Sequence, residues 1–398
     1  MTPYLQERRE ELIRAYRGGL LDDVIPFWIR HGLDRESGGI WTALGRRGEV
    51  VDTDKSVWFQ GRAAWTFATL HNLVGPRIEW LDAALSCGRF LRDRCAGPDG
   101  KLNFTVTAGG DPLRMRRYVF SECFAASGYA ALRRATGDEA WGLLSRAAYD
   151  AFLRHSFEPG LIPPKVSPQT RPMKGLAPLM MTLVTAQDLR EDLGDVSVRG
   201  RTMSEWAAWA VDEIARDFVK PDLQAVMESV GPGGEVIDHF EGRLLNPGHA
   251  IEASWFIMRE AKLRGRDDWM RLGLDMLRWM WGRGWDPEHG GLLYFTDVHG
   301  RPVQEYWHPM KFWWPHNEAI IATLMAHLVT GDAAFAEMHR QVHDWSHRHF
   351  PDPGHGEWFG YLDRQGRPTS ELKGSMWKGP FHLPRQQLMC WRMLEEAR

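Results

Sequence analysis

Two histidines stand in sequence settings that suit proton transfer. His249 lies in Asn246-Pro-Gly-His-Ala-Ile-Glu252, and His382 lies in Phe381-His-Leu-Pro-Arg385. Asparagine can cap a helix and proline suits its first turn, so the sequence predicts a helix start at each place, with His249 inside and His382 just before it. The positive end of a helix favours the neutral imidazole, which accepts protons. Two such groups can act as general base and general acid.

A repeated turn precedes these positions. Six segments share a turn, a short β-prone run and a second turn that glycine closes, a pattern that predicts a small β-hairpin. They begin at Asp34, Asp99, Glu158, Asp222, Asp286 and Asp352. The first and the last two are the clearest copies, and the copy near Glu158 is degraded. Because the starts lie 59 to 66 residues apart, the chain is interpreted as six units of nearly constant length.

Between the turns the sequence has helical periodicity. In 57–70, 251–263 and 318–328, apolar residues recur at intervals of three and four. A unit of about 64 residues leaves room, beside its hairpin, for two helices of ordinary length. Six such pairs can close on themselves, and neither end has an obvious polar capping repeat. We therefore predict an all-α fold with short β-hairpins in its loops, an (α/α)6 barrel that forms a single domain over residues 1–398.

Ionisable side chains recur where the inner helix of each unit is expected to begin, 16 to 32 residues after its turn. They are Arg62, Arg117, Glu122, Lys174, His249, His316, Glu318 and His382. In a closed ring, residues at one phase of the repeat converge on the axis, so these side chains predict a site. Glu252 lies three residues after His249 on the same helix face, and we expect it to orient the imidazole.

Each of these residues also has a purely structural interpretation. Arg62 can be an ion-pair partner in the core, and Glu252 or Glu318 can pair with arginine. Lys174 can be an ordinary surface lysine. The 20 tryptophans can fill a bulky core or stack against a sugar. We include Trp313 among the expected substrate-binding residues, although packing is the commoner role of such a side chain.

Composition argues against several other classes of protein. The chain has 49 Lys+Arg against 52 Asp+Glu, a formal net charge of -3, which predicts no nucleic-acid or membrane partner. The N-terminus is too charged for a secretory signal, and the longest apolar run, near 176–184, is half the length of a membrane span. Four cysteines without CxxC spacing fit a reducing cytoplasm.

Metal and phosphate motifs give weaker signals. His343-Asp-Trp-Ser-His-Arg-His349 has ligand-like spacing but no accompanying glutamate, and it lies on an expected outer helix. We therefore predict no metal site. Neither GxxxxGK[ST] nor GxSxG occurs, and Gly231-Pro-Gly-Gly234 is interpreted as a hairpin turn rather than a phosphate-binding loop.

Seven motifs together resemble the N-acylglucosamine 2-epimerase family, also called renin-binding proteins, nearly end to end. The motifs are Trp58-Phe-Gln-Gly-Arg62, Ser121-Glu-Cys-Phe124, Asn246-Pro-Gly-His-Ala-Ile-Glu252, Gly284-Trp-Asp-Pro-Glu-His-Gly-Gly291, Lys311-Phe-Trp-Trp-Pro-His-Asn-Glu318, Gly356-Glu-Trp-Phe-Gly-Tyr361 and Lys378-Gly-Pro-Phe-His-Leu-Pro-Arg385. The resemblance implies an (α/α)6 barrel that forms a homodimer, and interconversion of N-acetylglucosamine and N-acetylmannosamine. It also implies ATP as an allosteric effector rather than a reactant.

The resemblance assigns roles by position. It implies that His249 and His382 are the acid/base pair, that Arg62 and Glu318 hold the substrate, and that Glu252 supports His249. One position departs from the family, in which an asparagine is common where 178–184 has Leu183 or Val184. Related aldose–ketose isomerases and cellobiose epimerases place histidine near that point, whereas Lys174 agrees with some epimerases.

Two other functions are kept as alternatives. The first is an aldose–ketose isomerase or a 2-epimerase of unsubstituted sugars such as mannose, fructose or glucose. The second belongs to a different class, a catalytically silent toroid that binds a sugar or a protein. Neither alternative needs a change in the expected fold.

Overall fold

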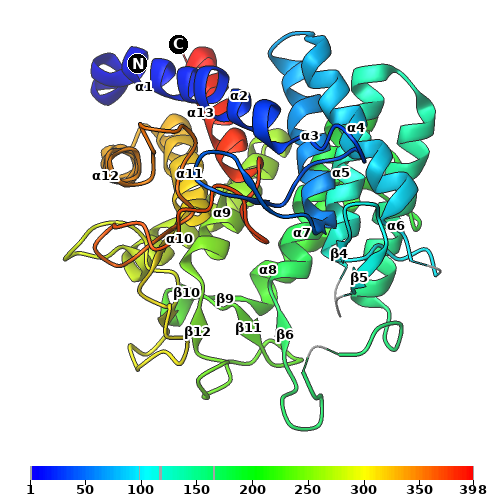
Figure 1. Cartoon of the computed structure of the whole chain (residues 1–398). Helices are drawn as coiled ribbons and strands as arrows, with labels where there is room; N and C mark the ends of the chain where they lie inside the picture. The colour runs from blue at the N-terminus through cyan, green and yellow to red at the C-terminus, as the bar shows by residue number, and fades with distance from the viewer. Residues whose placement is uncertain (1, 98, 116–118, 165, 398) are drawn as a thin grey trace.

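The computed structural model describes residues 2–97, 99–115, 119–164 and 166–397 (Figure 1). Arg117, one of the residues expected at the site, lies outside them. These residues form twelve α-helices when 3–32, which alternates α-helical and π-helical turns, is counted as one, and a short 3-10 helix at Pro221–Leu223. Figure 1 shows the two termini together at one end of the molecule and most of the short strands at the other.

Inner and outer helices alternate along the chain. The inner helices are α3 (Val57–Leu73), α5 (Phe120–Thr136), α7 (Ala177–Leu193), α9 (Pro247–Arg264), α11 (Trp313–Thr330) and α13 (His382–Glu396). The outer helices are α1 (Pro3–Gly18) with its continuation through α2 (Ile25–Phe27), α4 (Ile78–Arg94), α6 (Glu139–Phe157), α8 (Met203–Asp217), α10 (Asp267–Gly284) and α12 (Ala333–His349). Each inner helix contacts the next one, and each outer helix pairs with an inner one.

The ring closes between α3 and the residues that precede α13. The Thr66 hydroxyl donates to the carbonyl of Pro380 at 2.7 Å, and the rings of Trp65 and Phe381 are 5.3 Å apart. Close approach inside the ring also requires glycine, since a Cβ on Gly61 would lie 2.5 Å from the backbone of α5. The predicted all-α fold, an (α/α)6 barrel, is confirmed.

Short antiparallel strands connect the units. The pairs are β1 (Ala43–Leu44) with β2 (Val50–Asp52), β4 (Thr105–Val106) with β3 (Lys55–Ser56) and β5 (Pro112–Arg114), β6 (Lys174–Gly175) with β11 (Ser229–Val230), β7 (Ser197–Val198) with β8 (Arg201–Thr202), β9 (Val219–Lys220) with β10 (Ala225–Val226), β12 (Leu244–Leu245) with β13 (Thr296–Asp297), and β14 (Lys311–Phe312) with β15 (Tyr361–Leu362). Four of these pairings, those of β3, β6, β12 and β14, join neighbouring units.

The repeated turns are present in the structure, but several are closed by a single bridge rather than by a full β-hairpin. Single antiparallel bridges close the turns that begin at Asp34, Asp99, Asp286 and Asp352, and β9–β10 closes the turn at Asp222. The degraded copy at Glu158 has no bridge among the described residues of its turn. Its following strand, β6, pairs instead with β11 of the next unit.

Buried ion pairs fix the three clearest turns onto the strands or loops that lead to the next inner helix. The pairs are Asp34–Lys55, Asp286–Lys311 and Asp352–Lys373, with N–O distances of 2.6, 3.0 and 3.1 Å. One oxygen of each aspartate also accepts from backbone amides of its own turn. Because each of these lysines is fully buried, its positive charge depends on the aspartate.

We expect Asp286→Asn to lower the free energy of unfolding by about 3–5 kcal/mol, because it leaves Lys311 buried without a carboxylate. Burial already lowers the pKa of Lys311 to about 8. Chemical denaturation at pH 7 measures the effect. The control is Arg266→Ala, which breaks an exposed pair with Asp268 and should cost less than about 1 kcal/mol. Equal losses in the two variants would contradict the structural role of the buried pair.

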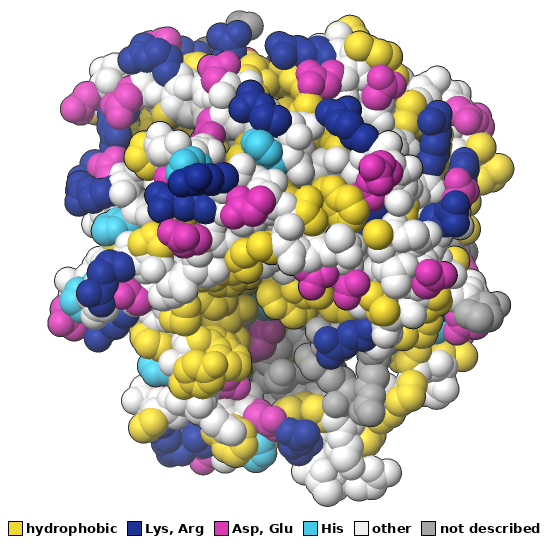
Figure 2. Space-filling model, in the orientation of Figure 1, with side chains coloured by type: hydrophobic (Ala, Val, Ile, Leu, Met, Phe, Trp, Pro, Cys, Tyr) yellow, Lys and Arg dark blue, Asp and Glu magenta, His cyan; other side chains and the backbone are white. Residues whose placement is uncertain are grey.

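The surface shows where the barrel is hollowed. Figure 2 shows a recess in the lower half of the visible face, with hydrophobic side chains gathered beside it.

Among the described helices, none is both long and apolar enough to span a bilayer.

Candidate active site

His382 is the first residue of α13 and is buried. Its Nδ1 lies 2.7 Å from Oε1 of Glu318, and its ring contacts Trp313, Trp314 and Phe381. Because a carboxylate only accepts hydrogen bonds, Nδ1 carries the proton and Nε2 keeps the lone pair that a base needs. Burial lowers the pKa of His382 well below its usual value, so the neutral, proton-accepting form predominates at pH 7.

His249 lies in the first turn of α9. The Asn246 side chain caps this helix by accepting from the amide of His249 at 3.2 Å. Nδ1 of His249 lies 3.0 Å from each carboxylate oxygen of Glu228. Glu228 directly precedes β11, and its carbonyl accepts from the amide of Leu176 just after β6. The strand pairing therefore places a carboxylate beneath His249, which again leaves the lone pair on Nε2.

The ring of Trp314 contacts both histidines. It belongs to the first turn of α11, which packs against both α9 and α13. Its ring centroid is 5.0 Å from that of His249 and 5.8 Å from that of His382. The centroids of the two imidazole rings therefore lie less than about 11 Å apart. Such a spacing lets two proton acceptors reach the same small molecule from two different helices.

Arg62 is a buried cation held by aromatic rings. Its guanidinium carbon lies 4.1 Å from the ring centroid of Phe124, 5.0 Å from that of Phe381 and 5.1 Å from that of Trp58. Its Nε has no hydrogen-bond partner among the described residues. Burial lowers the pKa of Arg62 to about 9, so it stays cationic at pH 7. Such a cation can bind an oxygen on which negative charge develops.

Helices α9, α11 and α13 contribute the side chains of a charge network that includes the carboxylate partner of His382. Nη2 of Arg385 lies 2.5 Å from Oε1 of Glu252 and 2.7 Å from Oε1 of Glu318. The indole of Trp255 donates to Oε2 of Glu318 at 2.9 Å. Because both oxygens of Glu318 have partners, this carboxylate is fixed and can hold His382 in one orientation.

Arginine occupies the place where a metal ion would have to bind. One ligand atom from each of Glu252, Glu318 and His382 lies within 4.8 Å of the others, a spacing that an ion could bridge. Arg385 already contacts both carboxylates, and its positive charge would repel a cation at that point. The carboxylates of Glu252 and Glu318 are therefore already bound by Arg385 and not by a metal ion.

Comparison with known proteins gives a match along nearly the whole chain. The sequence profile of the family N-acylglucosamine 2-epimerase (GlcNAc 2-epimerase) matches residues 38–382. The chain belongs to this family. Relatives include the N-acylglucosamine 2-epimerases of Bos taurus, 38% identical over 98% of this chain and 93% of the relative, and of Homo sapiens, 37% identical over 98% and 92%. The solved cellobiose 2-epimerase of Bacillus thermoamylovorans is 19% identical and superposes with a TM-score of 0.83 over 97% of this chain and all of that one.

Of the residues that we expected at the site of this N-acylglucosamine 2-epimerase family member, His316 uses both ring nitrogens in structural contacts, whereas Glu122 uses one carboxylate oxygen and its Oε2 has no partner among the described residues. Nε2 of His316 accepts from the amide of Leu292 at 2.9 Å, and its Nδ1 lies 2.6 Å from the carbonyl oxygen of Phe312, so both ring nitrogens are used. Oε1 of Glu122 accepts from the amide of Leu102, and burial raises the pKa of Glu122 to about 7. The expectation that His316 contacts substrate is therefore corrected.

Three other expected residues have mixed outcomes. Lys174 pairs with Asp217 at 2.7 Å, so its ammonium group already has a carboxylate partner. Glu252 binds Arg385 and not the Nδ1 of His249, for which Glu228 supplies the carboxylate; the expected orienting role of Glu252 is corrected accordingly. Trp313 is buried with its ring 6.2 Å from that of His382, beside the expected acid/base pair.

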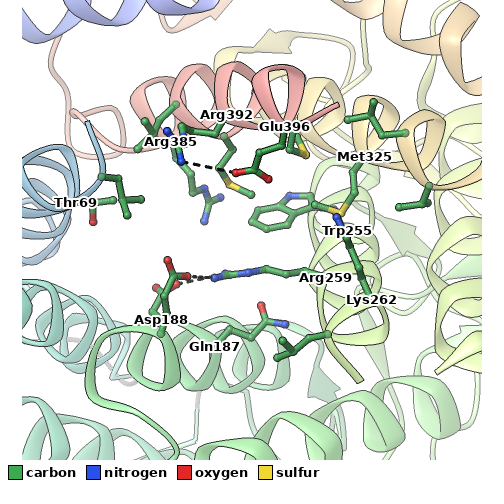
Figure 3. Close-up of a pocket in the computed structure, with 18 of the residues that line it drawn as sticks. Thr69, Gln187, Asp188, Trp255, Arg259, Lys262, Met325, Arg385, Arg392 and Glu396 are labelled. Carbon is green, nitrogen blue, oxygen red and sulfur yellow. Dashed lines mark hydrogen bonds and ion pairs between the residues drawn. The ribbon is translucent and has the colours of Figure 1, made fainter. Parts of the chain in front are cut away.

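The structure also adds residues that the sequence analysis did not assign to the site. They are Glu228, Trp255, Trp314 and Arg385. At the position where the sequence departs from the family, Leu183 is fully buried and Val184 lines a cavity at the far end of the barrel (Figure 3).

Proposed function

We propose that this protein is a sugar 2-epimerase, an isomerase that interconverts N-acetylglucosamine and N-acetylmannosamine. The observation that carries the proposal is the pair His249 and His382, each with a carboxylate at Nδ1 and with ring centroids 5.0 and 5.8 Å from that of Trp314. The relatives at 37–38% identity are named N-acylglucosamine 2-epimerases, whereas cellobiose 2-epimerase of Bacteroides fragilis is 21% identical, which supports the N-acylated sugar.

In the proposed reaction the sugar first opens, because its C2–H is acidic only beside the C1 aldehyde. Nε2 of one histidine removes the C2 proton, and the electron pair moves to the carbonyl oxygen to give an enolate. Arg62 balances the charge on that oxygen. The other histidine, protonated, then delivers a proton to the opposite face of C2. The configuration at C2 inverts, and the two histidines regain their starting protonation states when one loses a proton to solvent and the other takes one up.

Proton NMR in D2O tests this proposal against the isomerase alternative. We expect N-acetylglucosamine to yield N-acetylmannosamine with deuterium at C2. An isomerase returns the proton to C1 and needs a hydroxyl at C2, a route that the N-acetyl group blocks. Formation of fructose from mannose, with no action on N-acetylmannosamine, would overturn the proposal. If none of these sugars turned over while one still bound, the chain would be a binding toroid.

We expect Glu228→Gln to lower kcat by about 10–100-fold with little change in KM. The amide still accepts a hydrogen bond but no longer stabilises the protonated imidazole of His249. Steady-state rates across pH 6–9 measure the effect, and Glu228→Asp should recover part of it. The matched control is Glu235→Gln, which changes an exposed glutamate in the neighbouring turn. Equal rates for Glu228→Gln and this control would remove Glu228 from the mechanism.

The proposed chemistry needs no cofactor, and ATP is proposed only as an effector, on the resemblance. The glycine-rich turn 231–234 does not fit a phosphate group, because its amides are used within the turn: those of Gly231 and Gly233 donate to Glu235, and that of Gly234 donates to Gly231. The proposed epimerisation therefore contains no step in which a nucleotide takes part. Epimerisation rates with and without ATP test the effector role.

We also propose a homodimer in the cytoplasm. The dimer follows from the family resemblance, and sedimentation equilibrium tests it. All four cysteines are free and buried, which suits a reducing compartment. Fractionation of the producing cell tests the location.

A further inference from the structure

The last of the three clearest turns carries a glutamate where the other two carry glycine. Gly39, Gly291 and Glu357 each lie five residues after the aspartate that begins their turn, and the carbonyl of each accepts from the amide of that aspartate. All three have left-handed backbone, with φ of +78°, +73° and +58°. Glycine adopts this conformation without strain, whereas glutamate does not. A strained glutamate at this place indicates that its side chain has a role.

The side chain of Glu357 is buried and binds a lysine. Its carboxylate pairs with Nζ of Lys378, and each of the two residues is 1% exposed. Lys378 also donates to the carbonyl of Lys373 at 3.0 Å, and Lys373 is the lysine that pairs with Asp352 in the same turn. The amide of Glu357 donates to Asp23 at 2.8 Å. The backbone and the carboxylate of Glu357 are therefore both fixed.

Lys378 begins the short segment that enters α13, the red helix of Figure 1. The three residues between Lys378 and His382 pack tightly against α3. A Cβ on Gly379 would lie 2.6 Å from the ring of Phe59, and the next two residues make the contacts with α3 that close the ring. Because only these packed residues separate the two side chains, a displacement of Lys378 moves the start of α13 and with it His382.

Lys378 also contacts the segment that begins α11. A Cβ on Gly360 would lie 2.7 Å from Cδ of Lys378 and 3.5 Å from the ring of Trp313. The carbonyl of Gly360 accepts from the amide of Trp313, the first residue of α11, at 3.0 Å. Since α11 carries Glu318, the carboxylate partner of His382, the lysine packs beside the starts of both helices that form this hydrogen bond.

We propose that Glu357 and Lys378 are positioning residues for His382. Their ion pair, together with the hydrogen bond from Lys378 to the loop backbone, fixes the segment that enters α13. The fixed segment keeps Nδ1 of His382 against Glu318 and leaves Nε2 available for proton transfer. This inference rests on the proposed function, because it concerns one proton transfer of that reaction.

Loss of this positioning should affect the two faces of C2 differently. A displaced His382 transfers protons slowly on its own face, whereas His249 still removes and replaces hydrogen on the other. The ratio of C2 exchange to epimerisation in D2O should therefore rise for the epimer that His249 deprotonates, which is the epimer that His382→Asn still exchanges. A smaller fraction of folded protein, in contrast, lowers exchange and epimerisation by the same factor and leaves this ratio unchanged.

The test variant is Glu357→Gly/Lys378→Met. Glycine restores the residue of the two equivalent turns and relieves the backbone, and methionine replaces the lysine without leaving a buried charge unpaired. We expect the ratio of exchange to epimerisation to rise at least about tenfold, because a small misplacement of a catalytic group is costly. Glu357→Gln, which keeps the size of the side chain, should raise the ratio by a smaller factor.

The matched control is Asp34→Asn/Lys55→Met, which removes another fully buried ion pair. The strand that contains Lys55 leads into α3, which carries Arg62 and neither histidine. Exchange and epimerisation should therefore fall together, and their ratio should stay within about twofold of that of the unaltered protein. Circular dichroism and thermal unfolding establish that each variant is folded.

Two results would overturn this inference, and they are distinguishable. A ratio within about twofold of the unaltered protein in both Glu357→Gly/Lys378→Met and Glu357→Gln would overturn the positioning role and leave the proposed function intact. Absence of both exchange and epimerisation in the unaltered protein, with either sugar, would overturn the proposed function and this inference with it.

Discussion

Replacing His382 with asparagine is expected to lower kcat/KM for N-acetylglucosamine by about 10³–10⁴-fold, the upper range for loss of a general acid or base. Asparagine can still donate to Glu318, so the buried carboxylate keeps a partner. It cannot accept the C2 proton or return it. His249→Asn should lower the rate by a similar factor, because each turnover uses both groups.

Steady-state assays in both directions measure this effect, with thermal unfolding as a check of folding. The control is His71→Asn, which changes a histidine near the far end of α3 whose Nδ1 lies beside the carbonyl of Arg77. Its rate should equal that of the unaltered protein. A loss of less than about tenfold in His382→Asn would mean that another group moves the proton.

Replacing Arg62 with methionine is expected to lower kcat by about 10²–10³-fold. The enolate charge exists only after deprotonation, so the loss should fall on kcat more than on KM. Methionine keeps contact with Trp58, Phe124 and Phe381, so the core stays filled. Arg62→Lys keeps a positive charge and should recover part of the rate.

A matched control distinguishes charge from packing in that experiment. Arg77 also stacks on a tryptophan, with its guanidinium 4.5 Å from the ring centroid of Trp80, but it lies on the outside of the barrel. Arg77→Met should leave kcat unchanged. If Arg62→Met retained normal kcat, the enolate oxygen would have to be stabilised by another group, and the proposed role of Arg62 would be abandoned.

The ring itself was predictable from sequence because its signal is periodic. The turns at Asp34, Asp286 and Asp352 are each followed by a buried lysine 21 or 25 residues later. Each of these ion pairs forms within a single repeat unit, so its two residues recur together in the sequence. The pairing of strands between units, such as β6 with β11, has no comparable signal. The two strands are far apart in the chain, and each is only two residues long. The sequence of either strand is therefore too short to indicate its partner.

The site was predictable in its height along the barrel but not in its contacts. Phase within the repeat located His249, Glu318 and His382 at the same end of the inner helices. It does not fix the direction of a side chain: His316 and Glu318 are two positions apart on one helix, so they point to nearly opposite sides. His316 therefore contacts backbone, whereas Glu318 faces His382.

Long-range partners explain the remaining differences. Glu228 lies 21 residues before His249 and meets it only because β11 is held by β6. Arg385 joins Glu252 and Glu318 from two other helices. Helical spacing favoured Glu252 as the partner of His249, but an available buried guanidinium is a stronger partner for that carboxylate than a neutral imidazole.

The central claim is that His249 and His382 act on opposite faces of one carbon, and hydrogen exchange in the two single variants tests it most directly. His249→Asn and His382→Asn are each incubated in D2O with N-acetylglucosamine and, separately, with N-acetylmannosamine, and the C2 proton signal is followed. A lone histidine can remove and replace hydrogen on its own face only. The account predicts that one variant exchanges one epimer, that the other variant exchanges the other epimer, and that neither forms product. Exchange of the same epimer by both variants would contradict it.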